Sequence, residues 1–237
     1  MNIGLFGATG AIGERLLNEA LTRGHVVTAF TRSQSRVGVE RTGVAWKVAD
    51  ILDAESVRGV LGDLDVLVSS FGVGPRSDAS GSYTPASVAA AINDSGALVA
   101  AARSLLTALE RRPLLRLIVV GGAAGLEIAP GLQAVDSGPM ILGAIKDFGL
   151  PEEYKVVMEA HRDAMNLFRT SDRNWSYFCP AIITVPGERT GRFRLGGNQP
   201  VMDADGQSRI SYEDFAVALL DEVEIPTHVR QRFTIGY

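Results

Sequence analysis

The stretch Gly7-Ala8-Thr9-Gly10-Ala11-Ile12-Gly13 decides the fold of this chain. It follows the apolar run 3–6, which predicts a short buried strand, and precedes an amphipathic segment over 14–21, which predicts a helix. A dinucleotide pyrophosphate binds at such a turn, because the helix N-terminus offers unpaired N–H groups and a partial positive charge. The spacing is G-x-x-G-x-x-G and not the G-x-G-x-x-G of the Rossmann fingerprint, so the prediction rests mainly on the position of the motif between a strand and a helix. A plain glycine-rich turn is the alternative. We expect a dinucleotide to contact Gly7, Thr9, Gly10, Ala11, Ile12 and Gly13.

The end of the second predicted strand, over 25–30, bears on the choice of cofactor. In folds that prefer NAD, an acidic residue about 20 residues past the glycines accepts the ribose 2′-hydroxyl. Arg32 holds that place here, between Thr31 and Ser33. A guanidinium binds a 2′-phosphate that a carboxylate would repel. The sequence therefore predicts NADP(H) in preference to NAD(H), with a solvated surface arginine as the alternative.

Predicted strands and helices alternate along the chain, which favours a Rossmann-like, doubly wound α/β fold with a mostly parallel sheet and helices on both faces. We interpret 1–237 as a single domain, with a dinucleotide-binding core over 1–125 and mixed core and small substrate-side elements over 126–237. One long helix is expected over 84–109, beginning at the Thr84-Pro85 cap, with four apolar residues packed on the sheet: Val88, Ile92, Val99 and Leu106. Further strands are expected over 3–6, 44–49, 65–70, 115–120, 175–179 and 232–235, and further helices over 54–61, 152–168 and 211–221.

Ligands of open α/β sheets bind outside the carboxyl ends of the strands. Three of the predicted strand ends therefore join the glycine turn and Arg32 in one expected crevice: Asp50-Ile51, Phe71-Gly72-Val73 and Gly121-Gly122. Asp50 is expected to bond the adenine amino group and Ile51 to pack on the ring, although an aspartate in a loop equally satisfies local backbone N–H groups. The glycines at 72 and 121–122 allow close approach of the adenine-side ribose and the nicotinamide, or simply form turns.

Composition excludes several classes of function. The chain has 237 residues, 46% of them hydrophobic and 21% charged, with a net charge of −4. This balance gives no electrostatic reason to expect nucleic acid or a membrane surface as a partner, and no apolar run approaches the roughly 18 residues of a membrane span. The single cysteine, Cys179, and the absence of an N-terminal leader predict a cytoplasmic protein. We expect a small-molecule substrate, a monomer or homodimer, and no metal, because no Cys/His or carboxylate cluster has ligand spacing.

Several motifs besides the glycine turn carry a family resemblance: Val-Ala-Asp at 48–50, Gly-Gly-Ala-Ala-Gly-Leu-Glu at 121–127, Pro-Glu-Glu-Tyr-Lys at 151–155 and Pro-Gly-Glu-Arg-Thr-Gly at 186–191. With Thr-Arg-Ser at 31–33, they resemble the atypical short-chain dehydrogenase/reductases, in particular the NmrA-like and NADH-flavin reductase-like group related to biliverdin reductase B. The resemblance implies a Rossmann fold, an NADP cofactor and hydride transfer to a small aromatic acceptor. It also implies that the loop beside the nicotinamide carboxamide is Cys179-Pro180-Ala181-Ile182, in which we interpret Cys179 as a buried small residue.

The chain departs from ordinary short-chain dehydrogenases in its catalytic residues. Those enzymes use a Tyr-x-x-x-Lys pair, but Tyr154 has Met158 four residues on. Tyr154 and Lys155 are adjacent and point about 100° apart on a helix, so they cannot form that pair. The remaining catalytic candidates are Tyr154, Lys155 and His161. Lys155 is also a candidate for contact with the ribose, and the ordinary pKa of His161 suits proton transfer. For Lys155 and His161 a solvated or structural role is the alternative.

Two classes of function follow from these observations. The first is a small NADPH-dependent reductase acting on an aromatic, flavin-like or quinone-like acceptor, which needs chiefly correct placement of the acceptor. The second is a non-catalytic NADP(H)-sensing regulator, and a weaker third is an isomerase or epimerase relative that lost its activity. The apolar segment 128–150 is expected to be a substrate-side lid, or else a small helix that completes the core or contacts a partner copy.

Overall fold

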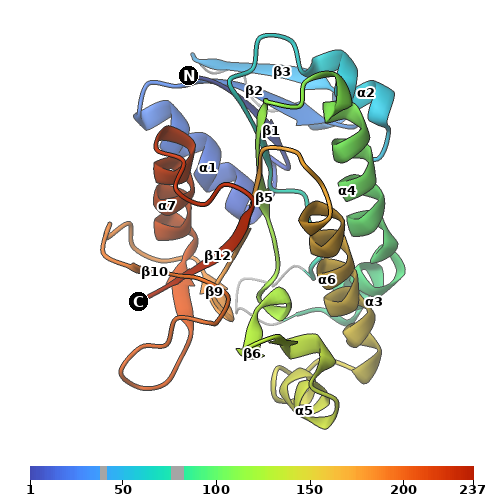
Figure 1. Ribbon diagram of the computed structural model, residues 1–237, viewed down its shortest axis with the longest axis vertical. Helices are drawn as coiled ribbons and strands as arrows, with labels where there is room; N and C mark the ends of the chain where they lie inside the picture. The colour runs from blue at the N-terminus through green and yellow to red at the C-terminus, as the bar shows by residue number, and fades with distance from the viewer. Residues whose placement is uncertain (38–41, 76–82) are drawn as a thin grey trace.

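Eight strands of the described chain form one central sheet in the order β10-β12-β8-β5-β4-β1-β2-β3. The computed structural model describes residues 1–37, 42–75 and 83–237, and Figure 1 shows its layout. Only β10 runs antiparallel to its neighbour among these strands. The strand order reverses between β1 and β4, so the predicted doubly wound Rossmann-like fold is confirmed. The strands are β1 (Asn2–Phe6), β2 (Val26–Thr31), β3 (Val44–Val48), β4 (Val66–Ser69), β5 (Arg116–Val120), β8 (Trp175–Cys179), β10 (Arg194–Gly196) and β12 (Gln231–Gly236).

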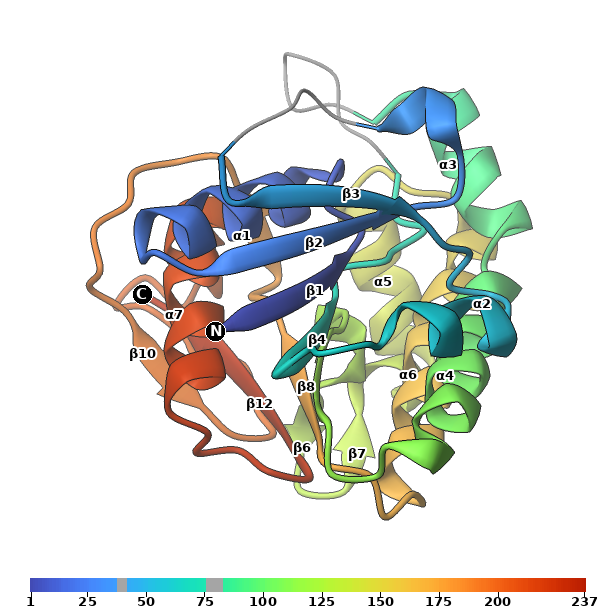
Figure 2. The ribbon, with the colours of Figure 1, turned by 90° about the horizontal axis from the view of Figure 1, so that it is seen from above.

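Helices cover both faces of this sheet, as Figure 2 shows. One face carries α1 (Ala11–Thr22) and α7 (Tyr212–Glu224), and the other carries α2 (Ala54–Val60), α4 (Gly96–Ala108) and α6 (Lys155–Arg169). Each face has its own hydrophobic cluster, the first containing Phe178 and Phe215 and the second containing Leu105 and Phe168. Because both faces are covered, the central strands are buried along their length. We therefore expect the residues that contact a ligand at the ends of these strands.

The expected long helix over 84–109 is in fact two helices, and that prediction was wrong. Thr84 caps α3 (Pro85–Asn93) by accepting a hydrogen bond from the Ser87 N–H at 3.2 Å. The chain then turns at Asp94 and Ser95 before α4 begins, since Asn, Asp, Ser and Gly in succession are weak helix formers. The break changes which side chains face the sheet. Val88 is buried as expected, but Ile92, Val99 and Leu106 are only half-buried. The buried residues of α4 are Leu98, Ala101, Ala102, Ser104, Leu105 and Ala108.

The segment expected to be a lid or a small helix contains both a hairpin and a helix. The hairpin joins β6 (Glu127–Ala129) to β7 (Leu132–Gln133), and α5 (Pro139–Asp147) follows. Ile141 and Ile145 of α5 are buried, whereas Met140 and Phe148 are exposed. This segment thus has a packed side and an open side.

The remaining elements are short. A separate parallel pair is formed by β9 (Ile183–Val185) and β11 (Arg209–Ser211). Short 3₁₀ turns are η1 (Gln34–Arg36), η2 (Leu109–Arg111), η3 (Ala123–Gly125), η4 (Ala134–Asp136) and η5 (Glu152–Tyr154). Ser211 caps α7 by accepting a hydrogen bond from the Asp214 N–H at 2.9 Å. None of the helices in the described ranges has the length and apolar character needed to cross a membrane.

Candidate functional site

The turn between β1 and α1 is shaped by backbone contacts that only glycine allows. Gly7 has a φ of +81°, and a Cβ there would lie 2.4 Å from the Ser70 carbonyl oxygen. A Cβ on Gly13 would lie 2.0 Å from the Gly7 oxygen. Gly10 is the residue immediately before α1, and no side chain in the described part of the protein caps that helix. The first-turn N–H groups of α1 are therefore available to an anion, with Thr9 and Ala11 exposed beside them and Ile12 half-buried.

The ends of the central strands meet along one edge, where they form the candidate site. The Ser70 N–H bonds the Phe6 oxygen at 2.9 Å, which joins the end of β4 to the end of β1. The Gly121 N–H bonds the Phe178 oxygen at 2.9 Å, which joins the ends of β5 and β8. Phe71, Gly72 and Val73 follow β4 at the same edge, and a Cβ on Gly72 would meet nothing within 4 Å. The structure thus brings these sequence-predicted residues together and leaves open space at Gly72.

Arg32 lies at this edge directly after β2 and is exposed. Its side chain forms no hydrogen bond or ion pair with residues 1–37, 42–75 or 83–237. The flanking hydroxyls are used locally, because Thr31 Oγ1 donates to the Ser33 oxygen at 3.3 Å and Ser33 Oγ bonds Ser35 Oγ at 2.8 Å. The guanidinium is therefore the group at the end of β2 that remains for a ligand.

Asp50 and Ile51 are engaged with the protein itself. One carboxylate oxygen of Asp50 accepts from the Leu52 N–H at 3.0 Å, and the Asp50 N–H donates to Ser56 Oγ at 3.0 Å. This favours the local structural role that the sequence left open for Asp50. Ile51 is 5% exposed and belongs to the hydrophobic core, so little of its side chain remains to pack on an adenine ring.

Gly121 and Gly122 are glycines because aromatic side chains of the protein press against them. A Cβ on Gly121 would lie 2.1 Å from Cε1 of Tyr177, and a Cβ on Gly122 would lie 2.9 Å from Cγ of His161. The loop that follows is held by Arg232 of β12, which donates to the Gly125 oxygen and pairs with Glu127. The residues at both ends of the family motif over 121–127 therefore have structural roles within the protein.

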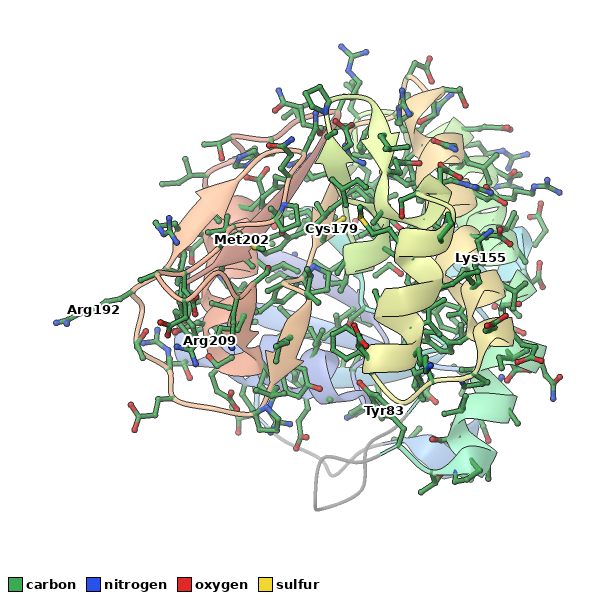
Figure 3. All side chains as sticks on the ribbon, turned by 90° about the horizontal axis from the view of Figure 1, so that it is seen from below. Tyr83, Lys155, Cys179, Arg192, Met202 and Arg209 are labelled. Atoms are coloured by element: carbon green, nitrogen blue, oxygen red, sulfur yellow. The ribbon has the colours of Figure 1, made fainter. Side chains whose placement is uncertain are left out.

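The two adjacent candidates at the start of α6 have different surroundings. Tyr154 is half-buried, and burial, with a smaller contribution from Tyr83, raises its pKa to about 12, so its phenol is protonated near neutral pH. Lys155 Nζ donates to Glu159 Oε1 at 2.7 Å. Sequence reasoning missed Glu159, although its spacing of four residues from Lys155 on a helix signals such a pair. Figure 3 shows Lys155 on the α6 side of the molecule, apart from the more central Cys179.

His161 differs most from its expected behaviour. Burial of the imidazole lowers its pKa to about 4, so the ring is neutral at physiological pH. The expectation that its pKa suits proton transfer near neutrality is therefore wrong, because burial disfavours the charged form of the ring. Within the described residues, its Nδ1 is enclosed and has no hydrogen-bond partner.

The loop after β8 contains both buried and accessible residues. Cys179 is fully buried, which confirms its interpretation as a buried small residue, and burial raises the pKa of its thiol to about 12. Ala181 is also buried. Pro180 keeps some exposed surface and Ile182 is 44% exposed, so these two side chains are the ones able to face a ligand.

Tyr83 and Tyr212 also belong to this region, and sequence reasoning missed both. Tyr83 precedes α3 and is near enough to Tyr154 and Tyr212 to contribute to raising their pKa values. The guanidinium of Arg15 lies 5.7 Å from the centre of the Tyr212 ring. No local sequence signal connects residues so far apart along the chain. The described residues contain no group of three or more His, Cys, Asp or Glu side chains placed to hold a metal ion.

Comparisons with known proteins agree with this geometry. A family model described as NAD(P)H-binding matches residues 7–223. Three solved bacterial structures are similar over the whole of this chain. The first is a Burkholderia pseudomallei protein that is named as a proposed exported protein. It is 37% identical to this chain, with a TM-score of 0.78 and 100% of both chains covered.

The other two structures have names that propose an activity. The Bacteroides thetaiotaomicron protein, named as a proposed epimerase, is 33% identical over 100% of this chain and 96% of that chain, with a TM-score of 0.76. The Streptococcus pneumoniae protein, named as a proposed NADH-flavin reductase, is 27% identical over 100% of this chain and 99% of that chain, with a TM-score of 0.75. Together with the family model, these likenesses support an oxidoreductase that binds a nicotinamide nucleotide.

Proposed function

This chain belongs to the NAD(P)H-binding family, and from that premise we propose that it is an NADPH-dependent reductase whose acceptor is a small aromatic molecule such as a flavin or quinone. The observation that carries the cofactor part is the turn at Gly7–Gly13. Its glycines leave no room for side chains, and the α1 N-terminus has no side-chain cap in the described chain. That geometry fits a pyrophosphate, which needs close backbone approach and free N–H groups.

Arg32 supports NADPH rather than NADH. An exposed guanidinium without a partner among the described residues stands where the adenine-side ribose of a Rossmann cofactor ends. It matches the charge and the planar geometry of a 2′-phosphate. Arg32, the α1 amides and the open space at Gly72 would together hold the adenosine half of the nucleotide.

The acceptor class is supported by what the site lacks and by its aromatic residues. Tyr154 is followed by Met158, not lysine, at the fourth position, so the usual means of protonating a carbonyl substrate is missing. The nucleotide, when bound, supplies hydride from its nicotinamide ring, and the protein then needs chiefly to orient the acceptor and exclude water. Tyr83, Tyr154 and Tyr212 offer flat surfaces for an aromatic acceptor. The NADH-flavin reductase name of the Streptococcus pneumoniae relative points to the same class.

Calorimetry with NADPH and NADH tests the cofactor assignment. Arg32→Ala is expected to raise the Kd for NADPH by about tenfold or more, because a charge-assisted contact is worth about 1.5–3 kcal/mol, while the Kd for NADH changes less than about twofold. Arg192→Ala is the matched control, since Figure 3 shows Arg192 extending away from the body of the protein. Equal increases in Kd for both nucleotides would contradict the assignment of Arg32 to the 2′-phosphate.

A panel of acceptors separates the reductase from the regulatory alternative. One observation favours a sensor: Lys155, the lysine nearest the expected catalytic position, is already paired with Glu159. We expect oxidation of NADPH in the presence of FMN, riboflavin, a quinone or biliverdin. Tight NADPH binding without turnover across the panel would favour the NADP(H)-sensing regulator.

The cytoplasmic location and the simple assembly are also part of this proposal. A single cysteine, fully buried, is in keeping with a reducing compartment, whereas the name of the Burkholderia pseudomallei relative proposes export. Cell fractionation decides between the two locations. Light scattering in solution is expected to give the mass of a monomer or a homodimer.

A further inference from the structure

His161 of α6 lies between the ends of two central strands. Its ring packs against Gly122 after β5, where a Cβ would meet Cγ at 2.9 Å and Nδ1 at 3.1 Å. It also lines a cavity of about 20 Å³ together with Ser69 at the end of β4, Phe71 and Tyr177. The imidazole is therefore at the carboxyl edge of the sheet, on the face opposite α1, beside the crevice in which the proposed nucleotide would lie.

The two ring nitrogens of His161 have different surroundings. Nδ1 is enclosed and has no hydrogen-bond partner in the described part of the chain. Nε2 is not among the enclosed atoms, and the residue keeps some exposed surface. An enclosed N–H without an acceptor is the rarer arrangement in proteins, so Nδ1 is the unprotonated nitrogen and Nε2 carries the hydrogen. The cavity is lined mostly by apolar residues, and the hydroxyl of Tyr177 donates to the backbone oxygen of His161 at 3.3 Å.

The ring is also electrically neutral. Burial alone lowers its pKa to about 4. Tyr177 is the other titratable residue that lines the cavity, and burial raises its pKa, so it too is uncharged. An Nε2–H group on a neutral ring is a hydrogen-bond donor that does not give up its proton.

We propose that neutral His161 donates a hydrogen bond from Nε2 to the acceptor atom on which negative charge develops during reduction. This rests on the proposed function. The acceptor gains a hydride, that is, two electrons and one proton, while the nicotinamide is oxidised, and a second proton from solvent completes the product. The imidazole keeps its proton throughout and stabilises the developing charge, a role that a neutral histidine can fill. His161 thereby replaces the tyrosine donor that this chain lacks at the usual spacing.

Nitrogen NMR of histidine-labelled protein tests the protonation state without any reaction. At pH 6.0 and 7.5 the His161 signals are expected to be those of a neutral ring with hydrogen on Nε2, and the Nε2 signal is expected to shift when NADP⁺ and FMN are added together. His161→Asn identifies the signals by removing them, and His25 and His228 serve as internal references. A charged ring at pH 6.0, or hydrogen on Nδ1, would overturn the proposal.

Two variants test the catalytic role. His161→Phe removes the donor and is expected to lower kcat with FMN or menadione about 100-fold, with the Kd for NADPH changed less than about threefold. His161→Asn keeps an N–H donor and is expected to stay within about tenfold of the original kcat, which keeps the test usable where the phenylalanine variant does not fold. His25→Asn, distant from the site, is expected to match the unaltered protein.

The outcomes separate the two proposals. Full activity of His161→Phe overturns the role of His161 while the reductase function stands. An unaltered protein that reduces no acceptor overturns the reductase function and, with it, the role of His161 in catalysis. The NMR assignment of the tautomer is independent of both results.

Discussion

The two edges of the central sheet differ in how their charged side chains are buried and paired. At the amino edge, Arg116 at the start of β5 pairs with Glu222 of α7 at 2.5 Å, and both side chains are buried. Thr227 and His228 donate further hydrogen bonds to the same carboxylate. At the carboxyl edge, Arg32 and Nδ1 of His161 have no partner among the described residues.

The difference lies in the burial and pairing of the charged groups. An enclosed polar atom without a partner destabilises a fold by about 1–3 kcal/mol, and both edges carry this cost, because Nε of Arg116 is also enclosed without a partner among the described residues. A buried ion pair with further hydrogen bonds cannot lose one of its partners without a large loss of stability. The amino edge therefore anchors the fold, and the carboxyl edge is where ligands are expected.

Glu222→Ala tests the amino edge and is expected to have the largest effect. It leaves the buried guanidinium of Arg116 without its charged partner, which should lower the free energy of unfolding by about 3–5 kcal/mol. Urea denaturation measures this loss, and calorimetry at a temperature where the variant is folded should find the Kd for NADPH within about threefold of normal. A variant that stays stable, or that folds but no longer binds NADPH, would break the separation between the edges.

The pH dependence of stability tests the burial of His161 at the carboxyl edge. His161 has a folded pKa of about 4, below its ordinary value of 6.5, so between these pH values the unfolded chain binds a proton that the folded protein does not. Stability is therefore lost as the pH falls from 6.5 towards 4, with a slope of at most about 1.4 kcal/mol per pH unit. His161→Asn should lack this component, which is measured as the difference in unfolding free energy between the two proteins at pH 7, 6 and 5. Parallel curves would mean that the imidazole stays hydrated in the folded protein.

The sequence predicts the carboxyl edge well where the signal is local. The glycine turn at 7–13 and the position of Arg32 after β2 follow from a few neighbouring residues and a known topology. The surroundings of His161 cannot be predicted in this way, because Gly122 and Ser69 reach it from other strands. The single helix expected over 84–109 fails for a related reason, since the break at Asp94 and Ser95 interrupts an apolar pattern that continues on both sides.

The amino-edge network illustrates the same limit. Arg116 and Glu222 come from segments far apart in sequence, and neither has a local pattern that marks it as buried. Sequence reasoning therefore finds the glycines and charged groups at strand ends more readily than it finds the charges that hold the fold together. Lys155 is an exception with a local cause: its pairing with Glu159 follows from helical spacing.

Gly72→Ala tests whether the open space at the carboxyl edge serves the nucleotide. The added Cβ meets nothing within 4 Å in the protein, so the free energy of unfolding should change by less than about 0.5 kcal/mol. The Kd for NADPH should nevertheless rise about tenfold, roughly 1.4 kcal/mol, because the methyl group projects where the ribose would approach. Gly13→Ala is the matched contrast, since its Cβ would meet the Gly7 oxygen at 2.0 Å and should reduce stability and binding together. Unchanged affinity in Gly72→Ala would move the nucleotide away from β4.

Arg189→Ala should have the smallest effect and shows what burial adds to pairing. Arg189 bonds both carboxylate oxygens of Glu19 at 2.8 Å, yet its own side chain is 54% exposed, and Glu19 keeps a second partner in Arg23. The carboxylate of Glu19 is buried, but it stays paired with Arg23, and an ion pair whose guanidinium is exposed contributes about 0–1 kcal/mol and weakens with salt. The loss in urea denaturation should therefore be within that range and smaller still in 1 M NaCl. The Kd for NADPH should not change. A loss as large as that of Glu222→Ala would mean that the contribution of a charged group to the free energy of unfolding depends on its number of contacts and not on its burial.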